Sequence, residues 1–98
     1  MKDHNYFVYI TTNPGKTVLY TGVTNDLTIR LEQHYENRGS KKTFAGRYYC
    51  YKLIYYERFE EIASAIEREK EIKDFSRAKK EALICEQNPK WNFLDVFE

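Results

Sequence analysis

Side chains suited to proton transfer and phosphate chemistry lie close to one junction between an extended segment and a helix. Tyr20 is part of the extended run "VLYTGV", and Arg30 and His34 follow it in "NDLTIRLEQHYE". A spacing of four residues places Arg30 and His34 one turn apart on the same edge of a helix. Tyr9, in an earlier extended run, adds a second phenol. Combined with one acid and one amide later in the chain, this set suits phosphodiester cleavage.

The acid is Glu69, which stands out in the strongest helix pattern of the chain, residues 60–74. A carboxylate on a core-facing stripe is costly unless a cation, several donors or a metal ion compensates it. Lys73 follows four residues later, so an ion pair between the two is the alternative to a metal site. At about 100° per residue, Glu69 falls in the middle of one apolar helix face, which comprises Ile62, Ala65, Ile66 and Ile72.

Positive charge is concentrated in residues 38–52, although the net charge of the whole chain is only +1. Tyrosines and Phe44 interleave with the cations, and this combination suits a surface that follows a phosphate backbone and touches bases. The alternative is a solvated loop whose aromatic side chains face the core. The stretch "RGSKKTFAGRYYCYK" contains no acid and has five basic residues: Arg38, Lys41, Lys42, Arg47 and Lys52.

Two strands and a helix are expected to position the first group of side chains. Residues 6–12 and 17–23 are rich in aromatic and β-branched types, and Pro14 and Gly15 favour a turn between them. A turn centred on these two residues would set Tyr9 directly opposite Tyr20, and a one-residue bulge would shift that pairing. A helix should follow, with Asn25 as its N-cap and apolar residues repeating at helical spacing.

The later half of the chain predicts one more strand and two helices. Residues 48–57 are nearly all aromatic or aliphatic and suit a central strand. Helices are expected over residues 60–74 and 76–86, with Ser76 as the cap of the second. Asn88 precedes Pro89 and is either a turn former or a site residue. We therefore expect an α+β fold, a small three-stranded antiparallel sheet flanked by helices, formed by a single domain over residues 1–98.

Composition narrows the class of protein further. With 98 residues and 42% hydrophobic residues, the chain is long enough for one core, and no run is long enough to cross a membrane. The first residues do not resemble a secretion signal, so a cytoplasmic location is expected. Cys50 and Cys85 are then expected to be buried thiols rather than a disulfide. With His4 and His34, they lack the paired spacings of zinc sites.

The order of these residues resembles the GIY-YIG nucleases, and in particular the small, stand-alone bacterial members of that superfamily. "FVYI", residues 7–10, is similar to the first half of the name motif, and "YTG", residues 20–22, is similar to the second half. Arg30 and His34 follow at the expected offset. Phe7, Val8 and Thr21 depart from the motif letters, whereas both tyrosines and the glycine are retained.

The resemblance implies a role for each matching residue. Glu69, in "EREKEIK", corresponds to the metal-binding glutamate of the family and would hold one Mg²⁺ or Mn²⁺. Tyr9 would help to activate the attacking water, which requires a pKa lowered by Arg30 and the metal. Arg30 would bind the scissile phosphate. Tyr20 and His34 would orient groups or relay protons, and Asn88, in "NPKW", would fix backbone or phosphate geometry.

The substrate implied by the resemblance is a nucleic acid, most simply DNA, cut in repair or recombination. Arg38, Lys41, Lys42 and Arg47 are the residues expected to contact it. A chain of this length would take its specificity from a partner protein, from a homodimer or from the shape of the DNA, and no membrane contact is expected. Two rival interpretations are a nucleic-acid-binding module that does not cut and a protein-interaction domain whose tyrosines are core residues.

Overall fold

The computed structural model describes residues 4–95, and the ends of the expected domain lie outside this range. Its sheet is antiparallel and has the order β2-β1-β3, formed by β1 (Tyr6–Thr12), β2 (Leu19–Thr24) and β3 (Lys52–Phe59). β1 is therefore the central strand, and the expectation that the third strand would be central is wrong. That strand also begins later than residue 48, because a short helix, α2 (Phe44–Arg47), precedes it.

The hairpin between β1 and β2 has a longer loop than a two-residue turn. Asn13 closes it, since its carbonyl accepts from the Lys16 amide and its side-chain oxygen accepts from the amides of Thr17 and Val18. The register is consequently shifted by two residues from the expected one: Tyr9 pairs with Gly22, and Tyr20 pairs with Thr11. A shift of two keeps every side chain on its expected face, because side chains alternate with a period of two.

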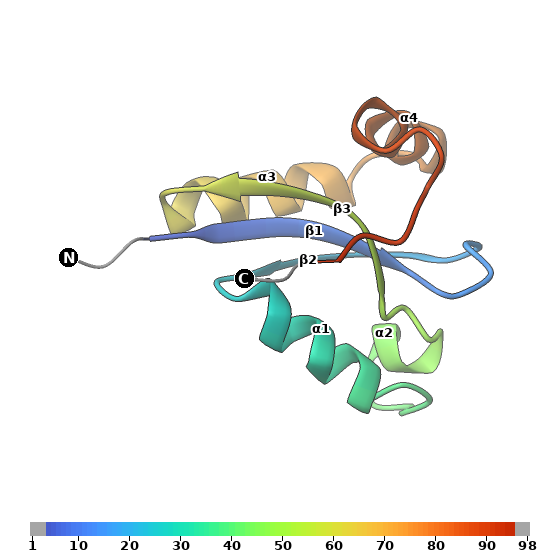
Figure 1. Cartoon of the computed structure of the whole chain (residues 1–98). Helices are drawn as coiled ribbons and strands as arrows, with labels where there is room; N and C mark the ends of the chain where they lie inside the picture. The colour runs from blue at the N-terminus through green and yellow to red at the C-terminus, as the bar shows by residue number, and fades with distance from the viewer. Residues whose placement is uncertain (1–3, 96–98) are drawn as a thin grey trace.

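Helices cover both faces of the sheet. Figure 1 shows α1 (Leu27–Glu36) and α2 on one side, and α3 (Ile62–Lys73) and α4 (Arg77–Gln87) on the other. The N-cap of α1 is Asp26, one residue after the predicted Asn25, and its side chain accepts from the Ile29 amide. Ser76 caps α4 as predicted. This α+β architecture confirms the expected fold class.

Two apolar clusters, one on each face, hold the helices to the sheet. The cluster under α3 and α4 includes Val8, Ile10 and Ile72, and the cluster under α1 includes Tyr9 and Leu27. β1 contributes to both because its alternate residues point to opposite faces. Its position in the middle of the sheet is what places the phenol of Tyr9 beneath α1.

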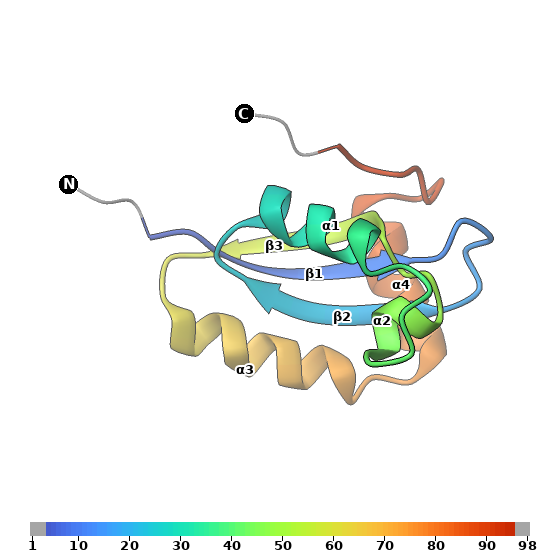
Figure 2. The same cartoon turned by 90° about the horizontal axis from the view of Figure 1, so that it is seen from below.

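Helix α3 presents a narrower apolar face than its sequence pattern indicates. Ala65 and Ile72 are fully buried, whereas Ile62 and Ile66 are 52% and 38% exposed. The helix packs on β1 and β2, and Figure 2 shows it running alongside β2 at the edge of the sheet. Because it lies at an edge, only part of its apolar stripe meets the sheet, and Glu69 lies at the border of the buried part rather than in its middle.

Two further expectations concern the membrane and the cysteines. None of the helices between residues 4 and 95 combines the length and the apolar character that crossing a bilayer requires. Both cysteines are free thiols, as expected, but only Cys50 is buried and Cys85 is exposed.

Candidate active site

The centre of the candidate site is the hydroxyl group of Tyr9, which connects β1 to α1. It lies 2.8 Å from Nε2 of His34, and Nη1 of Arg30 donates to it at 3.4 Å. The same Arg30 nitrogen donates to the carbonyl of Val23 at 3.3 Å. Arg30 and His34 reach one phenol because their spacing of four residues puts them on the side of α1 that faces β2. The sequence pattern predicted that Arg30 and His34 would share one edge of this helix beside the hairpin, but not that both would contact the Tyr9 hydroxyl.

Gly22 makes room for the phenol of Tyr9. A Cβ atom at this position would lie 2.5 Å from the Tyr9 oxygen and 2.6 Å from Cζ, which is far inside van der Waals contact. The two residues are cross-strand partners, so the absence of a side chain on Gly22 lets the Tyr9 ring lie across β2. The glycine of the "YTG" motif is therefore a packing requirement of the site.

The pKa of Tyr9 differs from the expected value. Burial raises it from 10.0 to about 12, and the charges of Tyr20 and Glu69 add to that rise, while Arg30 opposes it. The expectation of a lowered pKa is wrong for the protein alone, because the ring is fully buried and desolvation outweighs the single guanidinium. Tyr9 is consequently a neutral phenol at neutral pH.

His34 is neutral for a related reason. Burial and the positive charge of Arg30 lower its pKa from 6.5 to about 4. A neutral imidazole has one nitrogen without a proton, and at a distance of 2.8 Å the hydroxyl of Tyr9 can donate to Nε2 when the proton is on Nδ1. The pair is thus a phenol that donates to an imidazole able to accept its proton.

A row of aromatic rings extends from this pair toward solvent. The ring of Tyr20 lies 5.4 Å from that of His34 and 6.3 Å from the stacked ring of Phe44. Phe44 in turn lies 4.8 Å from Tyr48, and both rings are about half exposed. Phe44 is held there by α2, whose N-cap Thr43 accepts from the Gly46 amide. The sequence pattern indicated the aromatic residues of this stretch, but not that their rings adjoin the site.

Glu69 lies near the site but is paired with another residue. Its side chain is 15% exposed, and its Oε2 atom lies 2.8 Å from Nζ of Lys73, so the ion pair considered as the alternative is present. Its charge nevertheless reaches the phenol of Tyr9, whose pKa it helps to raise. No group of three or more His, Cys, Asp or Glu side chains is assembled within residues 4–95. A single carboxylate still fits Mg²⁺, which keeps several water ligands and also binds substrate phosphate.

The side chain of Asn88 forms hydrogen bonds to backbone groups in and near β3. The register between β1 and β3 shifts between Ile10 and Thr11, which makes Ile54 the extra residue of a bulge. The amide nitrogen of Asn88 donates to the Ile54 carbonyl at 2.9 Å and to the Asn92 carbonyl, and its oxygen accepts from the Asn92 amide. Both polar atoms are thus engaged with backbone groups, so a part of Asn88 in catalysis stays a prediction.

The residues predicted to contact nucleic acid are exposed and lie in and just before α2. Arg47 donates to the Lys41 carbonyl, whereas Arg38 donates to the Tyr35 carbonyl and covers the Tyr35 ring at 3.7 Å. Lys41, Lys42 and Arg47 are exposed and lie in the segment that carries Phe44. This arrangement brings cations and exposed rings to the same side of the sheet as Arg30.

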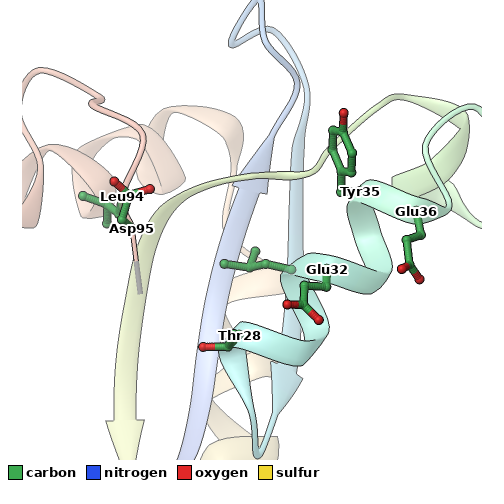
Figure 3. A pocket seen from close by; sticks show the side chains of 7 residues that line it. Thr28, Glu32, Tyr35, Glu36, Leu94 and Asp95 are labelled. Carbon is green, nitrogen blue, oxygen red and sulfur yellow. The ribbon is translucent and has the colours of Figure 1, made fainter. Parts of the chain in front are cut away.

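Two hollows flank α1. One, of about 330 Å³, lies beside the site and includes Arg30, Ile29 and Gln33. The other, of about 350 Å³, lies on the opposite side of the helix, where Figure 3 shows the carboxylates of Glu32 and Glu36 near its edge. The second hollow contains none of the predicted site residues, and its carboxylates disfavour a phosphate ligand. It is lined by Thr28, Leu31, Glu32, Tyr35, Glu36, Leu94 and Asp95.

Comparisons with known proteins match most of the chain. Residues 5–82 match the family model described as the GIY-YIG catalytic domain. A UPF0213 protein of Natronomonas pharaonis is 39% identical over 83 residues, which are 85% of this chain and 94% of that protein. A UPF0213 protein of Staphylococcus aureus strain Mu3 has the same identity over 83 residues, 85% of this chain and 98% of that protein. The solution NMR structure of a UPF0213 protein from Bacillus halodurans superposes with a TM-score of 0.56 at 32% identity and covers 89% of each chain.

Proposed function

Because the chain belongs to the GIY-YIG catalytic domain family, we propose that it is a metal-dependent endonuclease that hydrolyses phosphodiester bonds in DNA. The observation that carries this proposal is the contact of one phenol with a neutral imidazole and a guanidinium: Tyr9, His34 and Arg30. Packing alone does not require a buried tyrosine to have two such partners, whereas hydrolysis requires a proton acceptor and a cation side by side.

In the proposed mechanism, Tyr9 acts as a relay instead of a free phenolate. Its oxygen takes a proton from the attacking water while its own proton passes to Nε2 of His34. The water oxygen bonds to phosphorus, the bond from phosphorus to the leaving oxygen breaks, and the leaving oxygen takes a proton from solvent. The raised pKa of Tyr9 then presents no obstacle, because the phenol gains one proton as it loses another. His34 suits the role of acceptor because its lowered pKa keeps it unprotonated at neutral pH.

Arg30 would bind the scissile phosphate. In the protein alone its Nη1 makes two long hydrogen bonds, to Tyr9 and to the Val23 carbonyl. A phosphate oxygen is a stronger acceptor for a guanidinium than either of these groups. Movement of Arg30 onto the phosphate would also uncover the Tyr9 hydroxyl, which is buried in the resting site. Substrate binding would in this way admit the attacking water.

Glu69 would hold the divalent ion. A Mg²⁺ or Mn²⁺ there would supply positive charge that stabilises the leaving oxygen. The carboxylate is largely buried and lies close enough to influence Tyr9, which suits a ligand that faces the same phosphate.

The ion pair of Glu69 with Lys73 favours a second candidate function, a binding module that does not cut. A carboxylate that is engaged only by a lysine would have no catalytic task.

We propose that bound DNA lies across α2 and reaches the site from there. Lys41, Lys42 and Arg47 would contact phosphates, and the exposed rings of Phe44 and Tyr48 would contact bases. A function in repair or recombination, a partner protein or homodimer that supplies specificity, and a cytoplasmic location, where free thiols persist, are parts of the same proposal.

Incubation of the pure protein with nucleic acids tests the proposal directly. Single-stranded, duplex and branched DNA, and the matching RNAs, are incubated with Mg²⁺, Mn²⁺ or EDTA. We expect cleavage of DNA that depends on the metal and is abolished by Glu69→Gln. The control is Glu67→Gln, an exposed glutamate of the same helix, which should cut like the wild type. Binding without cleavage under every condition would favour the non-cleaving module.

A further inference from the structure

Lys73 forms the ion pair with the carboxylate that is proposed to hold the metal. The two residues lie four apart on α3 with the glutamate nearer the N-terminus, which is the favourable orientation for such a pair. Nζ of Lys73 is 2.8 Å from Oε2 of Glu69. One oxygen of the only carboxylate assigned to the metal is therefore already in contact with a positive charge.

The two partners differ strongly in exposure. The side chain of Glu69 is 15% exposed, whereas that of Lys73 is 51% exposed and belongs to the last residue of α3. A largely buried carboxylate needs a counter-charge because it has lost most of its water. A half-exposed lysine at a helix end, in contrast, can turn into solvent at little cost, since such pairs are weak. The carboxylate is thus the fixed member of the pair and the lysine is the replaceable one.

We propose that Lys73 is a positioning residue that occupies Glu69 when no metal is bound and is displaced when a divalent ion binds. This inference rests on the proposed function, because it takes Glu69 as the metal ligand. Lys73 neutralises the carboxylate in the empty site and holds it in place on α3. Metal binding must break the ion pair, so Lys73 lowers the affinity for the ion and couples occupancy of the site to release of the lysine.

The chain offers a matched control for this proposal. Lys70 is also in the last turn of α3 and is exposed, so it interacts with the helix dipole as Lys73 does. Among residues 4–95 it makes no ion pair with Glu69. Replacing either lysine by methionine removes one positive charge from the same helix end, and only the Lys73 variant frees the carboxylate.

Isothermal titration calorimetry with MnCl2, in the absence of DNA and at fixed ionic strength, measures the effect. Lys73→Met should bind Mn²⁺ about three- to tenfold more tightly than the wild type, because a weak competitor and a nearby like charge are both removed. Lys73→Arg retains the charge and should stay within about twofold of the wild type, as should Lys70→Met. Lys73→Gln should reproduce the tighter binding, and it replaces the methionine variant if that chain does not fold.

The outcomes separate this inference from the proposed function. Equal Mn²⁺ affinities for the wild type, Lys73→Met and Lys73→Gln would show that Lys73 only stabilises the helix, and would overturn the inference while leaving the metal site intact. Equal gains in Lys70→Met and Lys73→Met would reduce the effect to general charge and also overturn it. Absence of Mn²⁺ binding in every variant would overturn the metal role of Glu69 itself, and this inference with it.

Discussion

At the scale of single residues, burial controls the chemistry of the site more strongly than charge does. Tyr9 and His34 both favour their neutral forms because each is withdrawn from water: the pKa of the phenol rises to about 12 and that of the imidazole falls to about 4. Arg30 opposes the first shift and adds to the second. In the proposed relay across their 2.8 Å contact, the phenol stays neutral because it gains a proton as it loses one, and the imidazole becomes an imidazolium.

Tyr9→Phe tests this relay. The change retains the ring and its packing but deletes the hydroxyl group, so we expect the fold to persist and the cleavage rate to fall by about 10² or more. Tyr20→Phe should cost less, because its phenol lies beside the relay and not within it. Single-turnover rates on the substrate that the wild type cuts best provide the measurement. Equal rates for wild type and Tyr9→Phe would remove Tyr9 from the mechanism.

Gly22→Ala tests the space that the phenol of Tyr9 occupies. The added methyl group would overlap the Tyr9 ring, so we expect a loss of about 1–3 kcal/mol in the free energy of unfolding and a loss of cleavage. Urea denaturation measures the first effect. Gly15→Ala is the control, because its Cβ would meet only the Asn13 side chain at 3.7 Å. A Gly22→Ala variant as stable and active as the wild type would contradict the role of Gly22.

At the scale of elements, α1 carries the residues proposed for catalysis and α2 carries those proposed for DNA binding. Helix α1 carries Arg30 and His34 on the side that faces β2, while α2 presents the cations and rings of its segment to solvent. Each helix is oriented by a local cap, Asp26 for α1 and Thr43 for α2. Chemistry and substrate binding are thereby placed on two neighbouring elements, and binding is expected to be separable from cleavage by mutation.

The triple variant Lys41→Ala, Lys42→Ala, Arg47→Ala tests the contribution of α2. In a Glu69→Gln background that does not cut, we expect weaker DNA binding and a salt dependence that is flatter by about one unit of slope for each lost phosphate contact. Fluorescence anisotropy over a series of salt concentrations measures the slope of log K against log salt.

A second triple variant controls for the loss of net charge. Lys79→Ala, Lys80→Ala and Lys90→Ala remove the same charge from α4 and the turn that follows it, on the opposite side of the sheet. This variant should keep the wild-type slope. If both triple variants flatten the salt dependence equally, the basic stretch around α2 is a solvated loop with no special part in binding.

At the scale of the whole molecule, the buried site makes stability depend on pH. The pKa of His34 is about 4 in the folded protein and 6.5 in the unfolded chain, so the unfolded chain binds more protons between these values. The contribution of His34 to stability is complete above pH 6.5, decreases as the pH falls from 6.5 to 4, and does not change further below 4. The site that keeps the imidazole ready to accept a proton therefore destabilises the fold in acid.

His34→Gln tests this dependence. The glutamine does not titrate, so we expect the midpoint of urea denaturation to fall less between pH 7 and pH 4.5 in this variant than in the wild type. His4→Gln, at an exposed position, is the control and should behave like the wild type. A parallel decrease in wild type and His34→Gln would show that other groups cause the acid sensitivity.

The sequence by itself determined the features that depend on neighbouring residues. The aromatic and β-branched runs predicted the strands, and Ser76 predicted the start of α4. The spacing of four residues predicted that Arg30 and His34 would share one edge of α1 beside the hairpin. The resemblance based on the tyrosines and the glycine is confirmed by the family match over residues 5–82. These inferences succeed because helix caps, turns and side-chain periodicity are local properties of the chain.

Tertiary structure alone decided the strand order, the partners of buried groups and their pKa values. The β1–β2 register depended on how Asn13 closes the loop, and the pKa of Tyr9 depended on its burial and on Arg30, 21 positions away. Likewise the side chain of Asn88 donates to the carbonyl of Ile54, 34 positions away, and this contact depends on where β3 lies. Burial and long-range contacts depend on which segments of the chain pack together. The local sequence pattern does not determine that packing.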